Sequence, residues 1–286
     1  MQGGRGGFRT RPYWDPELDR ERALVIAPPE RGDYPLPTTY RLEAVVLRCR
    51  DLGEADRLLT LYSREHGKQQ AVARGVRRAS SRRAGALQPF AHLRCLVARG
   101  RQLDVITQVE LLNSFAKLRD DLTLLTWAGH ILELVDATGG EGDRGASFPL
   151  LLAALHLLAG GADPELTARA FELRHLSGAG LEPELTLCCR CGGPLGAQGE
   201  LRFSPAEGGA ICAACGKTSG GRLLRRGILA TMLYLKDADL RQVGRLVVSD
   251  RDRAELEALL RAYLEFHLDR QLRSLAFLDT LREQQH

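Results

Sequence analysis

The chain has 286 residues, 44% hydrophobic and 27% charged, a composition that excludes a mainly disordered or fibrous protein. The longest apolar stretch, residues 148–159, is shorter than the roughly 20 residues of a membrane span, so no transmembrane helix is predicted. The net charge is +4, but residues 38–110 alone carry fourteen Lys and Arg against seven Asp and Glu. This basic segment favours a polyanionic partner.

Residues 1–37 are rich in glycine, proline and paired charges and contain one short apolar run. We expect an extended tail outside the fold, or a start codon assigned too early. The arginines at the N-terminus are followed by no apolar segment, so no secretory signal is expected. The predicted compartment is the cytoplasm.

Residues 38–112 show the alternation of apolar and polar residues that is typical of half-buried strands. Five short strands are expected, at residues 41–50, 58–62, 69–74, 91–97 and 103–109, with a hairpin turn at 99–101. Five strands in about 70 residues favour a small closed barrel. The OB-fold, a five-stranded barrel that often binds oligonucleotides, fits this size.

From residue 113 the spacing of apolar residues becomes helical. Further helices are expected at about 149–159, 163–177 and 223–236, and Ser249 is expected to cap a last long helix. The predicted fold class is multidomain α+β. It has an OB-fold domain at 38–112 and a helical domain at 113–184 and 222–286, interrupted by a cysteine module at 185–221.

Five of the seven cysteines lie between residues 188 and 215, and four of them form the pattern CxxC, twenty residues, CxxC. Two thiolates three residues apart on a tight turn can occupy two corners of a tetrahedron, so the spacing predicts a zinc ribbon. Its ligands would be Cys188, Cys191, Cys212 and Cys215. Four protein ligands close the coordination shell, which indicates one structural zinc. Cys189 could replace Cys188, but CxC spans a metal poorly, so we treat it as a spare or a reactive surface thiol.

The second candidate site is a basic segment at residues 74–83, where five arginines are separated by small and apolar residues. It follows a predicted strand, so we expect an exposed loop whose guanidinium groups contact phosphates without reading sequence. A solvated charged loop is the alternative. The predicted DNA-binding residues are these five arginines and three basic residues expected near them: Arg74, Arg77, Arg78, Arg82, Arg83, Arg57, Arg64 and Lys68. Aromatic platforms are sparse (Tyr40, Tyr62 and Phe90), so mostly electrostatic binding is expected.

No catalytic motif is complete. Residues 216–218, Gly-Lys-Thr, are similar to the end of a phosphate-binding loop, but Ile211 stands where that pattern needs glycine. The zinc protease and zinc deaminase patterns are absent. A zinc-dependent nuclease needs an open metal position, which four cysteines do not leave, and no acid–base pair is visible for another enzyme. We expect no enzyme; an adaptor whose arginine loop meets an acidic protein is the alternative.

Several short motifs follow one another in an order and spacing that are specific as a set. They include Glu54-x2-Arg57-Leu58-Leu59-Thr60-Leu61, Arg64-Glu65-His66-Gly67-Lys68, Leu87-x-Pro89-Phe90 and Gly180-Leu181-x-Pro183-x-Leu185 ahead of the first cysteine pair. From about residue 40 to 281 the chain resembles the bacterial DNA repair protein family RecO. The intact set of four cysteines is similar to the Deinococcus form.

The resemblance implies a recombination mediator that binds single- and double-stranded DNA, anneals complementary strands and uses no nucleotide. It implies three partners, RecR, the acidic C-terminal tail of single-strand-binding protein and, indirectly, RecA, met in the cytoplasm and at the nucleoid during repair. The tail is expected on the helical part. Its pocket would need a basic residue near apolar side chains, for which Arg119, Arg169 and Arg174 are candidates.

Overall fold

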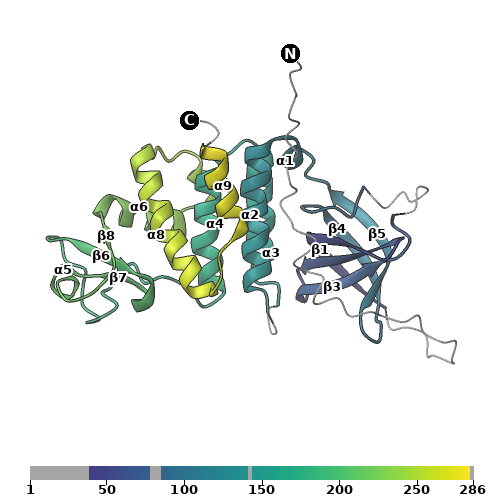
Figure 1. Cartoon of the computed structure of the whole chain (residues 1–286), viewed down its shortest axis with the longest axis horizontal. Coiled ribbons are helices and arrows are strands. Elements are labelled where there is room, and N and C mark those ends of the chain that lie inside the picture. Colours follow the sequence, from purple (N-terminus) through teal and green to yellow (C-terminus); the bar gives the residue numbers. More distant parts are fainter. Residues whose placement is uncertain (1–38, 78–84, 141–143, 284–286) are drawn as a thin grey trace, which may run out of the picture.

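The computed structural model describes residues 39–77, 85–140 and 144–283. Figure 1 shows three parts in a row: a β-barrel, a group of helices in the middle, and a small module with short strands. The tail predicted at residues 1–37 lies outside the described residues. In the described part of the chain, no helix is long and apolar enough to cross a membrane.

The first part is a closed barrel with the strand order β1-β2-β3-β5-β4. The strands are β1 (Thr39–Leu52), β2 (Asp56–Ser63), β3 (Gly67–Ala73), β4 (His92–Ala98) and β5 (Asp104–Asn113). Neighbouring strands are antiparallel except β3 and β5, which run parallel. Apolar side chains at alternate positions, such as Leu42, Ala44 and Val46, fill the interior because strand side chains alternate between faces. The predicted five-stranded, OB-like barrel is confirmed.

The middle part consists of helices that share one apolar core. They are α1 (Lys117–Asp120), α2 (Leu122–Thr138), α3 (Phe148–Ala159), α4 (Pro164–Gly178), α6 (Arg226–Asp237), α7 (Leu240–Val243), α8 (Asp250–Leu268) and α9 (Arg273–Glu283). The starts predicted at residues 163 and 249 are confirmed. Asp163 accepts a hydrogen bond from the Leu166 amide, and Ser249 accepts one from the Asp252 amide, so each satisfies a first-turn N–H group.

Two predicted helix boundaries differ from the structure. Asn113 belongs to β5, because it pairs with His92 across the barrel. Leu223 belongs to a strand that pairs with residue 202, so α6 begins only at Arg226. The last long helix ends at Leu268, where Asp269 takes a left-handed conformation with φ of 49°, and α9 follows as a separate helix. Helical spacing does not reveal pairing with a distant strand, so local periodicity misplaces the boundaries at Asn113 and Leu223.

The cysteine module is built on a three-stranded sheet with the order β7-β6-β8. Its elements are β6 (Leu201–Ser204), the 3-10 turn η2 (Pro205–Glu207), β7 (Gly209–Ile211), the short helix α5 (Ala213–Gly216) and β8 (Arg222–Leu224). Gly209 lies against the backbone of Glu184, where a Cβ atom would come within 2.2 Å of the carbonyl oxygen. The close approach requires glycine at this position and brings the segment before the first cysteine pair against β7.

The barrel is fixed on the helices by shared core and by ionic contacts. Tyr62 of β2 is buried in the helical core, and its hydroxyl accepts a hydrogen bond from the Ser147 amide at 3.3 Å. Asp136 of α2 is almost fully buried and pairs with Arg48 of β1 at 3.1 Å and with Lys68 of β3 at 3.0 Å. These contacts hold one side of the barrel against the helices and leave its other surfaces exposed.

Candidate functional site

The four predicted zinc ligands come together. The sulfur atoms of Cys188, Cys191, Cys212 and Cys215 all lie within 4.8 Å of one another, and the Cys191 and Cys212 sulfurs are 3.9 Å apart. Zinc–sulfur bonds of about 2.3 Å in a tetrahedron place sulfur atoms about 3.8 Å apart. The cluster therefore fits a four-coordinate metal ion bound by thiolates. Cys188 is buried and Cys191 is exposed, so the site lies at the surface of its module.

The turns of the two CxxC segments aim backbone donors at the cluster. The Gly192 amide donates to the Cys188 carbonyl at 2.9 Å and the Gly216 amide to the Cys212 carbonyl at 2.9 Å, which closes both turns. The Cys212 amide points at the Cys188 sulfur at 3.3 Å. Burial raises the pKa of Cys188, but N–H groups of Cys212, Cys191 and Arg190 outweigh it and lower the pKa to about 6. These N–H groups thus favour the thiolate form of Cys188, the form that binds metals.

Cys189 lies outside the cluster. Its amide donates to the Ala210 carbonyl at 3.0 Å, and burial raises the pKa of its thiol above the usual value. A thiol with a raised pKa is a poor nucleophile near neutral pH. The structure therefore favours Cys188 over Cys189 as the ligand.

Three of the predicted DNA-binding residues gather at one end of the barrel, where the turn between β1 and β2 meets the segment that follows β3. Arg74 and Arg77 are exposed there, and Arg57 lies beside them on β2. The guanidinium groups of Arg57 and Arg77 each lie 3.3 Å from a carboxylate oxygen of Asp51. This end of the barrel therefore presents several arginines to solvent. Arg78, Arg82 and Arg83 follow directly in the chain but lie outside the described residues.

Arg64 and Lys68 lie elsewhere, Arg64 on the turn between β2 and β3 and Lys68 at the start of β3. Arg57 and Arg64 are separated by most of the length of β2, roughly 23 Å along an extended strand. Arg64 pairs with Glu43 at 3.2 Å and lies over the Phe148 ring at 5.0 Å. Lys68 binds Asp136 of the helical part. Both side chains are thus engaged at or near the joint between barrel and helices, and the structure does not bring them to the arginine-rich end.

The aromatic candidates offer little stacking surface. Tyr62 and Phe90 are buried in the core. Tyr40 lies at an end of the barrel, where its hydroxyl donates to Asp104 at 2.5 Å and its ring meets the Arg99 guanidinium at 5.5 Å. Burial and the contact with Asp104 raise the pKa of the Tyr40 hydroxyl.

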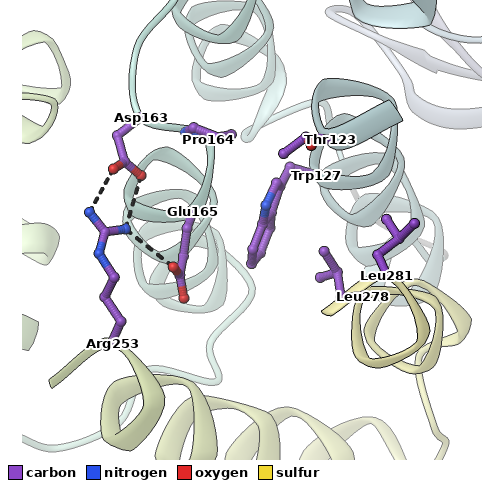
Figure 2. Close-up of a pocket in the computed structure, with 8 residues that line it drawn as sticks. All are labelled: Thr123, Trp127, Asp163, Pro164, Glu165, Arg253, Leu278 and Leu281. Carbon is purple, nitrogen blue, oxygen red and sulfur yellow. Dashed lines mark hydrogen bonds and ion pairs between the residues drawn. The ribbon is translucent and has the colours of Figure 1, made fainter. Parts of the chain in front are cut away.

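A pocket of about 250 Å³ lies in the helical part, between α2, α4, α8 and α9. Figure 2 shows Trp127, Leu278 and Leu281 on one side and Arg253 on the other. Arg253 is paired with Asp163 at 2.6 Å and with Glu165 at 3.2 Å. The sequence did not single out this basic residue beside apolar side chains, because it lies in an ordinary run of alternating charges, DRDRAE.

The three arginines predicted for such a pocket have other roles. Arg119 donates to the carbonyls of Pro89 and Ser114 at the joint between barrel and helices. Arg174 donates to carbonyls at the end of α6. Arg169 is completely buried and pairs with Glu172. Because its guanidinium has no exposed surface, the prediction that Arg169 meets a peptide is not supported by its position.

Comparison with known proteins finds a matching family model for each half of the chain. The model for the recombination protein O N terminal matches residues 38–115, and the model for the recombination protein O C terminal matches residues 119–276. The chain is 44% identical over 242 residues to the DNA repair protein RecO of Pelotomaculum thermopropionicum, covering 84% of this chain and 93% of that protein. It is 42% identical over 247 residues to the DNA repair protein RecO of Symbiobacterium thermophilum, covering 85% and 98% respectively. The barrel, the helices and these matches agree, and the chain belongs to the RecO family of DNA repair proteins.

Proposed function

We propose that this protein is a recombination mediator that binds single- and double-stranded DNA and anneals complementary strands. With RecR it would load RecA onto single-stranded DNA coated with single-strand-binding protein. The observation that carries the proposal is the gathering of Arg57, Arg74 and Arg77 at one exposed end of an OB-like barrel. The next arginines in the chain, Arg78, Arg82 and Arg83, add charge to the same segment.

Annealing follows from electrostatics. Two complementary strands repel each other through their phosphates, and a cluster of guanidinium groups reduces that repulsion when it contacts both. Arginine suits this role because its planar fork donates two parallel hydrogen bonds to a phosphate. With few exposed aromatic rings, binding would be independent of sequence and strongly dependent on salt.

The test is annealing of complementary oligonucleotides coated with single-strand-binding protein, in the absence of nucleotide. The native protein is compared with a variant in which Arg74, Arg77 and Arg78 are replaced by Ala. The variant should lose annealing, and its DNA affinity should fall with a log–log salt slope smaller by about one unit per lost contact. The matched control replaces three exposed arginines of the cysteine module and helices, Arg222, Arg241 and Arg245, and should anneal normally.

The outcomes separate the alternatives. If native protein and variant bind DNA equally, the arginine-rich end is not the DNA surface. If the native protein neither binds nor anneals DNA, an adaptor that meets an acidic protein partner replaces the mediator. Cleaved oligonucleotides would instead indicate an enzyme.

We infer that the cysteine cluster holds one zinc ion with a structural role, because four thiolates leave no open position for a substrate. Cys188→Ser should lose the metal, measured as zinc per chain in the purified protein, and should unfold the module. Cys189→Ser, the neighbouring control, should keep one zinc per chain. DNA binding should survive the loss of zinc, because the module lies on the far side of the helices from the barrel (Figure 1). A Cys188→Ser protein that retains zinc would contradict the ligand set.

We also propose that the acidic tail of single-strand-binding protein docks in the pocket of Figure 2, where Arg253 faces Trp127 and two leucines. The tail must displace Asp163 and Glu165 from Arg253, so modest affinity is expected. Arg253→Ala should abolish binding of a tail peptide, and the exposed Arg241→Ala should not. Unchanged peptide binding by Arg253→Ala would place the tail elsewhere.

A further inference from the structure

Asp51 stands between two of the arginines at the exposed end of the barrel. It lies near the end of β1, directly opposite Arg57 on β2. One carboxylate oxygen is 3.3 Å from the Arg57 Nε atom, and the other is 3.3 Å from an Arg77 Nη atom. A single anion with two oxygens therefore bridges two guanidinium groups, as a phosphate of the DNA backbone would.

The turn between β1 and β2 also holds the start of the basic segment in place. The Arg77 amide donates to the Ala55 carbonyl at 3.0 Å, and the Arg77 guanidinium donates to the Gly53 carbonyl at 3.0 Å. The Gly75 amide donates to the Asp56 carboxylate at 2.7 Å. Backbone contacts and Asp56 thus fix the position of the segment without Asp51. The contacts of Asp51 are with guanidinium groups that the fold has already brought together.

Stability does not explain the bridge. The Asp51 side chain is 53% exposed and the two arginine side chains are 26% and 36% exposed. Ion pairs in such surroundings contribute little to folding, because water screens the charges and the side chains lose freedom. The same weakness makes the bridge easy to exchange for another anion.

We propose that Asp51 is an internal competitor for DNA phosphate at Arg57 and Arg77, which limits affinity and speeds release of the annealed duplex. This inference rests on the proposed DNA-binding function of the arginine-rich end. When DNA binds, a phosphate replaces the Asp51 carboxylate on the two guanidinium groups. When the product leaves, Asp51 returns to them, so the arginines are never left without an anion. An annealing protein needs such reversibility, because a duplex that stays bound blocks the next round.

The experiment compares Asp51→Asn with Glu54→Gln. Both changes remove one negative charge from the same end of the barrel, and Glu54 contacts neither guanidinium among the residues that the structure describes. Affinity for a single-stranded oligonucleotide is measured by fluorescence anisotropy at several salt concentrations, and the dissociation rate is measured by stopped flow.

Asp51→Asn should bind the oligonucleotide roughly threefold to tenfold more tightly, because two exposed ion pairs no longer compete with phosphate. The tighter binding should come from slower dissociation. Its salt slope should stay within about half a unit of the native slope, because the final phosphate contacts are the same. Glu54→Gln should change affinity less than twofold.

Annealing supplies the second measurement. Asp51→Asn should match the native rate when protein exceeds DNA and fall behind it when each protein must act repeatedly, because release becomes slow. Equal affinities for Asp51→Asn and Glu54→Gln would overturn the competitor role and leave the DNA-binding function standing. Weaker binding by Asp51→Asn would show instead that Asp51 positions the arginines, which also overturns the proposal. A native protein that binds no DNA would overturn the proposed function itself, and this inference with it.

Discussion

The same side-chain chemistry appears in two opposite settings in this molecule. At the end of the barrel, Arg57, Asp51 and Arg77 form ion pairs in contact with solvent. In the helical core, Arg169 pairs with Glu172 at 2.7 Å and His130 contacts the same carboxylate at 2.5 Å, with all three side chains completely buried. The exposed pairs can exchange partners with ions from solvent at little cost, whereas the buried group is closed off from solvent, with a second carboxylate, that of Glu257, 3.7 Å from the Arg169 guanidinium. Burial therefore separates ions that can exchange partners from ions that hold the fold.

The buried group shows how the helical core keeps its charges. Burial alone raises the pKa of Glu172, but the Arg169 charge and the contact with His130 outweigh it and hold the pKa below its usual value. The Trp127 ring covers the Arg169 guanidinium at 5.1 Å. His130 also contacts the Ser274 hydroxyl at 2.8 Å, so the group ties α2, α4 and α9 together.

We expect the largest loss of unfolding free energy from Glu172→Gln. Removing the nearer carboxylate leaves the buried Arg169 charge with the more distant Glu257 carboxylate, at 3.7 Å, and breaking a buried ion pair costs about 3–5 kcal/mol of unfolding free energy. The control is Glu110→Gln, which breaks the exposed pair with Arg94 and should cost about 0–1 kcal/mol. Urea unfolding of both variants measures the difference. A loss below 1 kcal/mol in Glu172→Gln would mean that burial does not distinguish the two groups.

The carboxyl group of Glu172 should also make the stability of the fold depend on pH. A carboxyl group whose pKa is lower in the folded than in the unfolded chain stabilises the fold at any pH above its pKa in the unfolded chain. For Glu that pKa is about 4.3. That stabilisation is lost as the pH falls below this value towards the pKa of the folded state. We therefore expect the native unfolding free energy to decline steeply below about pH 4.3, and Glu172→Gln to decline less steeply. Urea unfolding at pH 7, 5, 4 and 3 tests this, and parallel curves would contradict it.

Asp136→Asn should have an intermediate effect, because Asp136 has an 8% exposed side chain and both of its partners reach solvent. Losing the charge-assisted contacts with Arg48 and Lys68 should cost about 1–3 kcal/mol. DNA affinity should change less than twofold, since these contacts lie at the joint between barrel and helices. A large loss of affinity with unchanged stability would place the DNA surface on the Lys68 side of the barrel.

Sequence reasoning succeeded where the signal is local. Alternating residues predicted the barrel, the spacing of the cysteines predicted the cluster, and the caps at Asp163 and Ser249 predicted helix starts. It failed where tertiary pairing decides, as for Leu223, which a distant strand draws into the sheet. The basic residues illustrate the same limitation. The sequence shows their charge but not their neighbours, and the pairing of β2 with β3 places Arg57 and Lys68 at opposite ends of these two strands. Arg253 was missed because only the fold brings Trp127 and α9 beside it.

We expect the smallest change in unfolding free energy for Asp51→Asn. With two variants already described, it forms a series in which the same chemical change is made in three different surroundings. Glu172→Gln, Asp136→Asn and Asp51→Asn each replace a carboxylate by an amide, at side chains that are 0%, 8% and 53% exposed. Asp51→Asn should change the unfolding free energy by less than about 0.5 kcal/mol. Its DNA affinity should nevertheless change most of the three, because only this carboxylate competes with phosphate. Two results would contradict the distinction between buried carboxylates that stabilise the fold and an exposed carboxylate that affects DNA binding. One is a loss of unfolding free energy that does not increase with burial, and the other is a change in DNA affinity that is largest for Asp136→Asn.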